Sequence, residues 1–171
     1  MKKLSYAVLA ALGLAAALVL GMWLRGDVGM TENQMRRDAA AQILAQEQRG
    51  GTSELGEKMA VFMSWDKNTH EDTELCVYVK HSGLSAGWFF RFGGSVSAAD
   101  DAIVELRVDG CRERAYVSGN AMHAVRCTIG NGGERSFGEY DPIVLVMPVN
   151  GGAVIFYDAD GNELPVQSMT L

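Results

Sequence analysis

Two groups of residues have side chains that could carry out chemistry. His70 precedes two acidic residues and is followed further along by His81, while Asp100 and Asp101 are adjacent to each other. Imidazole and carboxylate groups are ligands for zinc, so a loop that folded back could bring these groups together. One hypothesis is therefore a hydrolase or metal-dependent enzyme with a composite site near His70, His81, Asp100 and Asp101.

The other motifs favour structural roles. Residues 158–163 have the acidic spacing with which a calcium loop begins, but the terminal bidentate acid and the flanking helices are missing. Because predicted strands lie on both sides, a hairpin turn is favoured there. The sequence has no G-x-S-x-G, no phosphate-binding glycine loop after a strand and no H-E-x-x-H. We therefore assign no catalytic, cofactor-binding or metal-binding residue from the sequence, and expect no cofactor.

The three cysteines, Cys76, Cys111 and Cys127, all lie in the part of the chain that we expect to be exported. An oxidising compartment would allow one disulfide and leave one thiol, with three pairings open. The sequence favours a bond that uses Cys127, with Cys76 or Cys111 as the other end. A catalytic pair of Cys127 with His123 is excluded, because four residues along one strand span roughly 13 Å.

The N-terminal segment predicts the location of the chain. Residues 4–24 contain 21 residues without a charge, and a helix of that length covers roughly 30 Å, the thickness of a bilayer core. Lys2 and Lys3 precede this segment, so the positive-inside bias places the N-terminus in the cytoplasm and the remainder outside. We expect a single-pass signal anchor in a bacterial inner membrane, with Trp23 at the interface and the C-terminal domain in the periplasm.

A cleaved signal peptide is the competing interpretation. Residues 4–14 would then be its apolar region and the alanines at 15–17 its cleavage site. Residues 18–24 remain apolar, so cleavage there would leave an apolar new N-terminus, and we favour the uncleaved anchor. The chain is expected to be exported in either case.

The part of the chain after the first 49 residues is acidic. Residues 50–171 contain 9 basic and 17 acidic residues, a net charge of −8. A nucleic-acid-binding surface would be basic, and so would a surface that docks on anionic lipid. We therefore expect no nucleic-acid partner.

Residues 31–49 predict one helix next to the membrane. Thr31 and Gln34 have the spacing of a capping box, and glycines follow the last residue of the segment. Residues 50–58 are rich in glycine and polar residues, which predicts a flexible linker or an ordinary loop within one domain.

From residue 59 onward the apolar residues alternate with a period of two and turn signals become frequent. The predicted strands are 59–65, 73–80, 86–92, 102–108, 113–118, 121–129, 143–149, 153–157 and 163–169. Short strands at this spacing without a strong helix between them predict an all-β domain, an antiparallel β-sandwich or a barrel-like fold. We therefore divide the chain into a cytoplasmic end with the anchor (1–25), a juxtamembrane helix and linker (26–58) and a periplasmic β domain (59–171).

Alternation also predicts which side chains fill the core. Two apolar faces are expected inside, the first made by Leu75, Val77 and Val79 and the second by Val104, Leu106 and Val108. Trp88, Phe90 and Phe92 would form one aromatic row, for which burial is favoured over a role as a ligand platform. Residues 143–147 are apolar on both faces and predict a central strand, whereas 95–101 predict a loop or one helical turn.

The C-terminal part of the chain resembles the invasion-associated locus B-like family of exported bacterial proteins. The matching segments are ELCVYV at 74–79, ELRVDG at 105–110, VRC at 125–127, YDPIVLVM at 140–147 and AVIFYDADGNELPVQSMTL at 153–171. A second cysteine that the family has shortly after the VRC-like position is absent here. That family is all-β, linked to export and without a clear enzymatic activity, so the resemblance implies an envelope protein and assigns no site residues.

These observations together favour a membrane-anchored envelope protein whose β domain is a non-enzymatic binding or accessory module. An anchor and a stalk that carry a domain without catalytic motifs would present a surface to a protein partner in the cell envelope, through a sheet edge or the loops at one end. The hydrolase or metal-dependent enzyme is the second hypothesis. A small-molecule binder with a large apolar cavity is the third.

Overall fold

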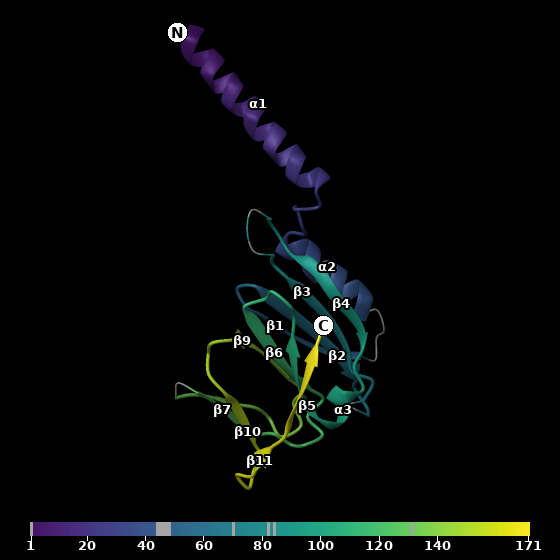
Figure 1. Ribbon diagram of the computed structural model, residues 1–171. Coiled ribbons are helices and arrows are strands. Elements are labelled where there is room, and N and C mark those ends of the chain that lie inside the picture. Colours follow the sequence, from purple (N-terminus) through teal and green to yellow (C-terminus); the bar gives the residue numbers. More distant parts are fainter. Residues whose placement is uncertain (1, 44–48, 70, 82, 84, 131) are drawn as a thin grey trace.

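The computed structural model describes residues 2–43, 49–69, 71–81, 83, 85–130 and 132–171, and in the first helix it describes side chains only at 8 and 11–24. The three helices of this part are α1 (Lys2–Leu24), α2 (Glu32–Ile43) and α3 (Ala98–Asp101). The strands are β1 (Arg49–Leu55), β2 (Met59–Asp66), β3 (Glu74–Val79), β4 (Phe89–Ser95), β5 (Ile103–Arg107), β6 (Glu113–Ser118), β7 (Arg126–Ile129), β8 (Gly133–Ser136), β9 (Ile143–Pro148), β10 (Val154–Tyr157), β11 (Glu163–Leu164) and β12 (Val166–Thr170). Helix α1 extends away from the body that the strands form (Figure 1).

Helix α1 covers the segment for which the sequence predicts a membrane span at residues 4–24. A span requires about 20 consecutive apolar residues in one helix. Among the residues that the structure describes, no helix combines the length and the apolar character needed to cross a membrane. The predicted transmembrane anchor is therefore wrong, and so is the single-pass inner-membrane and periplasmic location that depended on it.

The strands form three four-stranded sheets. The first sheet has the order β1-β2-β3-β4, the second β12-β5-β6-β9 and the third β11-β10-β7-β8. All pairs in these sheets are antiparallel except β12 with β5, which run parallel. The prediction of a mainly β protein with antiparallel sheets is confirmed.

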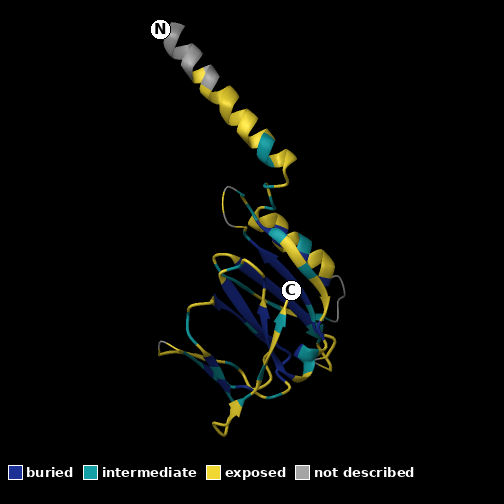
Figure 2. Ribbon diagram, viewed as in Figure 1, coloured by how far each residue is buried: buried dark blue, intermediate teal, exposed yellow. Residues whose placement is uncertain are grey.

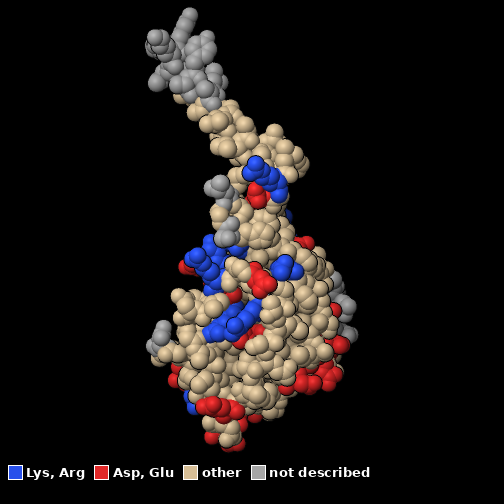
Figure 3. Space-filling model, viewed as in Figure 1, with Lys and Arg blue, Asp and Glu red and all other residues tan. Residues whose placement is uncertain are grey.

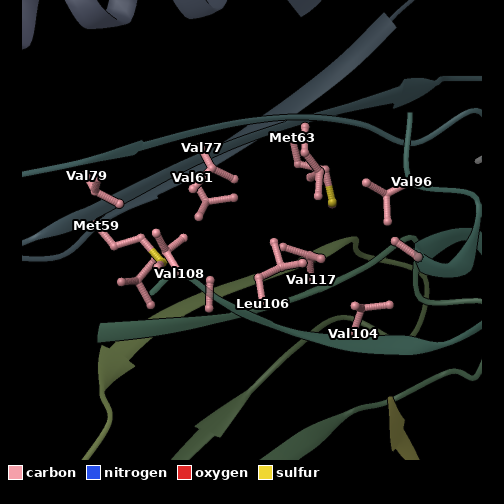
Figure 4. Close-up of a cluster of buried hydrophobic side chains, with 14 residues drawn as sticks. Met59, Val61, Met63, Val77, Val79, Val96, Val104, Leu106, Val108 and Val117 are labelled. Atoms are coloured by element: carbon pink, nitrogen blue, oxygen red, sulfur yellow. The ribbon is translucent and has the colours of Figure 1, made fainter. Parts of the chain in front are cut away.

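The first and second sheets share one hydrophobic core (Figure 4). Val61 and Met63 of β2 and Val77 of β3 face Leu106 of β5 and Val117 of β6 in this core. Every second residue of each strand points inward, as the period of a strand requires. The two apolar faces predicted from the sequence, at 75, 77 and 79 and at 104, 106 and 108, are both confirmed as buried.

A second core lies between the second and third sheets. It contains Ile103, Tyr116 and Leu145 from the second sheet and Cys127 and Phe156 from the third. Strand β9 therefore has both faces covered, although it lies at the edge of its sheet. The prediction that 143–147 is a central strand is wrong, because the burial comes from the two neighbouring sheets and not from strands on both sides.

Helix α2 packs on the outer face of the first sheet (Figure 2). Met35, Ala39 and Ile43, four residues apart, are its buried side chains. At its start the Thr31 backbone N–H donates to Gln34 Oε1 at 2.9 Å and the Gln34 N–H donates to Thr31 Oγ1 at 3.3 Å. The predicted capping box is therefore present, and Gln34 completes it from inside the helix.

The predicted helix end at residue 49 and the predicted linker at 50–58 are wrong. Arg49 begins β1, which pairs with β2 over its whole length; residues 44–48 lie outside the described residues. A Cβ atom added at Gly50 would lie 2.6 Å from the Trp65 ring. Glycine is thus needed at residue 50 for a close approach between strands, which explains a glycine-rich segment that is not flexible.

The predicted aromatic row, with Trp88 just before β4 and Phe90 and Phe92 within it, divides between the two faces of the first sheet. The pairing of β3 with β4 shifts between Val77 and Tyr78, as in a β-bulge. Because one extra residue reverses the alternation, Trp88 is buried under α2 while Phe92 packs against the inner core. Phe90 is 47% exposed. The prediction of one buried row is therefore correct for Trp88 only.

Candidate binding pocket

A cavity of about 440 Å³ opens at one end of the first two sheets. Four segments line it: the β2–β3 loop, α3, the loop after β6 and the loop before β9. The lining residues are Thr69, Glu71, Asp100, Asp101, Gly119, Asn120, Ala121, His123 and Tyr140. The cavity therefore lies where loops of both sheets meet.

Backbone hydrogen bonds hold α3 between these loops. The Thr73 N–H, at the start of β3, donates to Asp100 Oδ1 at 2.9 Å. The Val96 N–H donates to the Thr73 carbonyl at 2.9 Å, and the Gly119 N–H donates to the Ala99 carbonyl at 2.6 Å. Asp100 is half-buried and Asp101 is exposed. The short helix thus places two adjacent carboxylates on the wall of the cavity.

Asn120 organises the loop after β6. Its backbone has a φ of 69°, in the left-handed region that asparagine tolerates better than most residues. Its side chain is 2% exposed, accepts the Ala124 N–H at 2.8 Å, and donates to the carbonyls of Ala124, Gly138 and Glu139 at 3.2 Å each. One side chain therefore joins two loops that line the cavity.

We expect Asn120→Ala to lower the free energy of unfolding by roughly 2–3 kcal/mol, because it orphans buried backbone groups and strains a left-handed residue. Urea denaturation followed by tryptophan fluorescence measures this loss. Asn120→Gly removes the same hydrogen bonds but tolerates the left-handed backbone, so its loss should be smaller. Equal stability of Asn120→Ala and the unmodified chain would contradict this role.

His123 and Tyr140 form the aromatic part of the wall. Their rings meet edge to face, with centroids 5.0 Å apart at 78°. His123 Nδ1 lies 3.3 Å from the Glu139 carbonyl oxygen, and the His123 backbone has a φ of 53°. When Nδ1 carries the proton it donates to that carbonyl, which leaves Nε2 as an acceptor. Tyr140 is 63% exposed, so its ring is available to a ligand.

The charge of the cavity is negative. Three carboxylates line it, those of Glu71, Asp100 and Asp101, and no lysine or arginine is among the lining residues that the structure describes. A field of this sign attracts cationic groups and repels anionic ones.

Only part of the composite site predicted from the sequence is assembled. Asp100 and Asp101 line the cavity, but His81 stacks on Phe89 with ring centroids 4.1 Å apart and lines a different cavity. The predicted grouping of His81 with the two aspartates is therefore wrong, since His81 follows the end of β3 whose start lies beside Asp100. His70 lies outside the described residues.

Sequence reasoning missed His123 and Tyr140 as site residues. It placed His123 in a strand over 121–129, whereas the strand β7 begins only at Arg126. The left-handed residues Asn120 and His123 turn the chain before the strand starts. The segment Ser118-Gly119-Asn120 has the residue types of a turn, and it was the one local indication in the sequence that the chain bends there.

The remaining candidate motifs have structural roles in the described residues. Asp158 Oδ1 accepts the Asn162 N–H at 2.8 Å and Asp158 Oδ2 accepts Asn162 Nδ2 at 2.9 Å, so the acidic motif is the hairpin turn that the sequence favours. These hydrogen bonds lower the pKa of Asp158. Within the described ranges, no group of three or more His, Cys, Asp or Glu side chains could hold a metal ion.

The predicted disulfide is wrong, because all three cysteines are free. Cys76 lies under α2, Cys127 lies in the core between the second and third sheets, and Cys111 packs at the edge of the core between the first two sheets. Three separate clusters keep the thiols apart. Burial raises the pKa of each thiol, to about 11 for Cys76.

Comparison with known proteins found no match to this chain among family models, curated proteins or solved structures. The resemblance to the invasion-associated locus B-like family therefore stays a prediction.

Proposed function

We propose that this chain is a non-enzymatic binding module that takes a cationic group of a protein partner into the pocket at the loop end of its sheets. The observation that carries the proposal is a cavity of about 440 Å³ whose described lining residues include three carboxylates and an exposed tyrosine but no lysine or arginine. Arginine is the side chain that best matches such a wall, since its planar cation binds carboxylates and stacks on aromatic rings.

The arrangement of the wall supports recognition more than catalysis. Glu71 and Asp101 are exposed, so solvent partly screens the attraction between each carboxylate and a cation. Each contributes roughly 1 kcal/mol or less to the binding free energy. Asp100 already accepts the Thr73 N–H, which holds its carboxylate in place before a ligand arrives. Preorganised carboxylates lower the entropy that binding costs.

We propose a β-sandwich as the finer classification of the fold. The support for it is the core that the first and second sheets share, with the third sheet added on the outer face of the second. A sandwich of this kind gathers its loops at two ends, and the candidate pocket occupies one of them.

A second candidate function, hydrolysis at the same pocket, is favoured by the contact of His123 with the Glu139 carbonyl. With its proton on Nδ1 the imidazole presents Nε2 as a general base in the cavity that Asp100 and Asp101 also line. This hypothesis retains the two aspartates predicted from the sequence and replaces His81 by His123.

One titration tests both functions. We expect N-acetyl-L-arginine methyl ester to shift the amide signals of residues 119–121 in the ¹⁵N-labelled chain, with a dissociation constant of roughly 1 mM. The matching citrulline ester, which lacks the charge, should cause no such shifts. Glu71→Gln and Asp101→Asn should each weaken binding roughly threefold, because their side chains are exposed and their loss leaves the fold intact.

Glu163→Gln, an exposed change in β11, is the matched control and should leave the affinity unaltered. Equal shifts with the arginine and citrulline esters would contradict cation recognition. Loss of the methyl ester signal during the titration, abolished by His123→Asn, would favour the hydrolase instead.

A further inference from the structure

Two further cavities lie at the end of the first sheet opposite to the candidate binding pocket. Their volumes are about 220 Å³ and 130 Å³, and both are lined by Lys80, Gly110 and Cys111. Lys58 and Arg112 line the larger one, and His81 and Asp109 the smaller. The lining residues come from the β1–β2 turn, the segment after β3 and the β5–β6 turn.

These cavities have the opposite charge to the loop-end pocket. Lys58, Lys80 and Arg112 line the larger cavity without a carboxylate among its described lining residues. In the described part of the chain, none of these three cations forms an ion pair. The chain as a whole has a net charge of −6, so a positive cavity runs against its composition. Figure 3 shows acidic side chains gathered at the end where the β10–β11 hairpin lies, whereas several basic side chains elsewhere on this face lie next to acidic ones.

The acidic residues that adjoin the three cations in the chain or line these cavities are Glu57, Asp109 and Glu113, of which Glu57 is exposed. Asp109 is exposed and lines only the smaller cavity. Glu113 is 6% exposed and accepts the backbone N–H groups of residues 57, 58 and 59. Its charge is thus already solvated by backbone dipoles, and it leaves the three cations available to a ligand.

The backbone that carries the cations is held by hydrogen bonds. The Lys80 N–H donates to the Lys58 carbonyl at 2.8 Å, and the Val149 N–H donates to the Arg112 carbonyl at 2.9 Å. Lys80 Nζ lies 4.3 Å from the centre of the Trp88 ring, which restricts its position. The backbone of this site and the Lys80 ammonium group are therefore placed before a ligand binds, which lowers the entropy that binding costs.

The Cys111 thiol between them stays neutral. Burial is the main influence and raises the pKa of Cys111, although the backbone N–H groups of Glu113 and Arg112 and the charge of Lys58 act in the other direction. A neutral thiol does not compete with a ligand for the positive field.

We propose that Lys58, Lys80 and Arg112 form a binding site for a small oxyanion, the phosphate, sulfate or carboxylate group of a ligand. Two ammonium groups and one guanidinium provide charge-assisted donors for several oxygen atoms at once. The site is independent of the cation pocket, because β2 begins just after Lys58 and ends at Asp66, just before the pocket residue Thr69.

Titration of the full ¹⁵N-labelled chain with sodium phosphate at pH 7 and constant ionic strength tests this site. We expect saturable shifts of the amide signals of residues 110–112. Lys58→Gln and Arg112→Gln should each weaken phosphate binding at least fivefold. Both side chains are exposed, so these variants should keep the circular dichroism spectrum of the unmodified chain.

Lys67→Gln is the matched control, since it removes the same charge from an exposed residue in the β2–β3 loop. It should leave the affinity for phosphate unaltered. Parallel titrations with sulfate and acetate separate the oxyanion classes. Shifts with sodium chloride equal to those with phosphate, or equal weakening by Lys67→Gln and Arg112→Gln, would overturn the proposal.

Discussion

Replacing Glu113 by alanine is expected to lower the free energy of unfolding by about 4 kcal/mol, a large share of the 5–15 kcal/mol typical of a domain. The Glu113 carboxylate is the partner of three backbone donors in the β1–β2 turn, the N–H groups of Glu57, Lys58 and Met59 at 2.9, 2.8 and 2.7 Å. Alanine leaves these donors without an acceptor in a site that water barely reaches. Urea denaturation monitored by far-ultraviolet circular dichroism measures the loss.

Two further variants test separately the charge of the Glu113 carboxylate and the space that it occupies. Glu113→Gln keeps one acceptor oxygen and loses the charge, so about half of the loss is expected. Gly56→Ala should also lower the stability, because a Cβ at residue 56 would overlap the Glu113 carboxylate and displace it from the turn. Glu134→Ala, an exposed change in β8, is the control and should have little effect. If Glu113→Ala lost no more stability than Glu134→Ala, the carboxylate would not hold this turn.

Replacing Arg114 by methionine is expected to cost about 3–5 kcal/mol, since it removes the buried cation beside the buried Glu105 carboxylate and leaves it only the half-exposed Arg107. Arg114 Nη1 lies 2.9 Å from Glu105 Oε1, and the two side chains are only 9% and 8% exposed. Arg114 also donates to the Gly152 carbonyl, so it joins the second sheet to the loop before β10. Thermal and urea unfolding measure the loss.

The exposed ion pair of Arg36 with Glu32 is the matched control. Its side chains are 46% and 55% exposed, so Arg36→Met should change the stability by less than about 0.5 kcal/mol. The double variant Glu105→Leu with Arg114→Met should be more stable than Arg114→Met alone, because no buried charge remains and Arg107 is half-exposed to solvent. If Arg114→Met and Arg36→Met lowered the stability by similar small amounts, burial would not be what makes the Arg114–Glu105 ion pair important for stability.

The buried Glu105 carboxyl group also makes the stability depend on pH. Burial acts to raise the pKa of Glu105, but hydrogen bonds from Arg107 and Ser168 and the charges of Arg107 and Arg114 together hold the pKa below its ordinary value of 4.5. A carboxyl group with a lowered pKa stabilises the fold above its unfolded pKa, and this contribution is lost as the pH falls through the folded value. Stability should therefore decrease below about pH 5, and the decrease should be smaller in Glu105→Gln.

Local features were predicted well because their physical causes lie within a few residues. The capping box of Thr31 and Gln34 depends on a spacing of three residues within one turn of helix. Strand β6 has the predicted bounds, Glu113–Ser118. Alternation within β3 and β5 correctly indicated which side chains face the core between the first and second sheets, since the period of a strand determines which face each residue occupies.

Features that depend on distant residues were missed. The shift in pairing at Val77 and Tyr78 places Trp88 on the outer face of the first sheet. Strand β1 is rich in glycine because the Trp65 ring fills the space that a side chain at residue 50 would occupy. The parallel pairing of β12 with β5 joins segments more than 60 residues apart. Neither composition nor periodicity indicates which strands pair.

The candidate pocket shows the same division. The amino-acid sequence alone determined the supply of acidic side chains, the turn at 118–120 and the alternation that builds the strands. Only the tertiary structure decided that Asp100, Asp101, Glu71, His123 and Tyr140 line one cavity, and that His81 lies elsewhere. The physical reason is that side chains from separate loops meet only after the sheets have packed on a common core, and that packing depends on contacts between residues far apart in the chain.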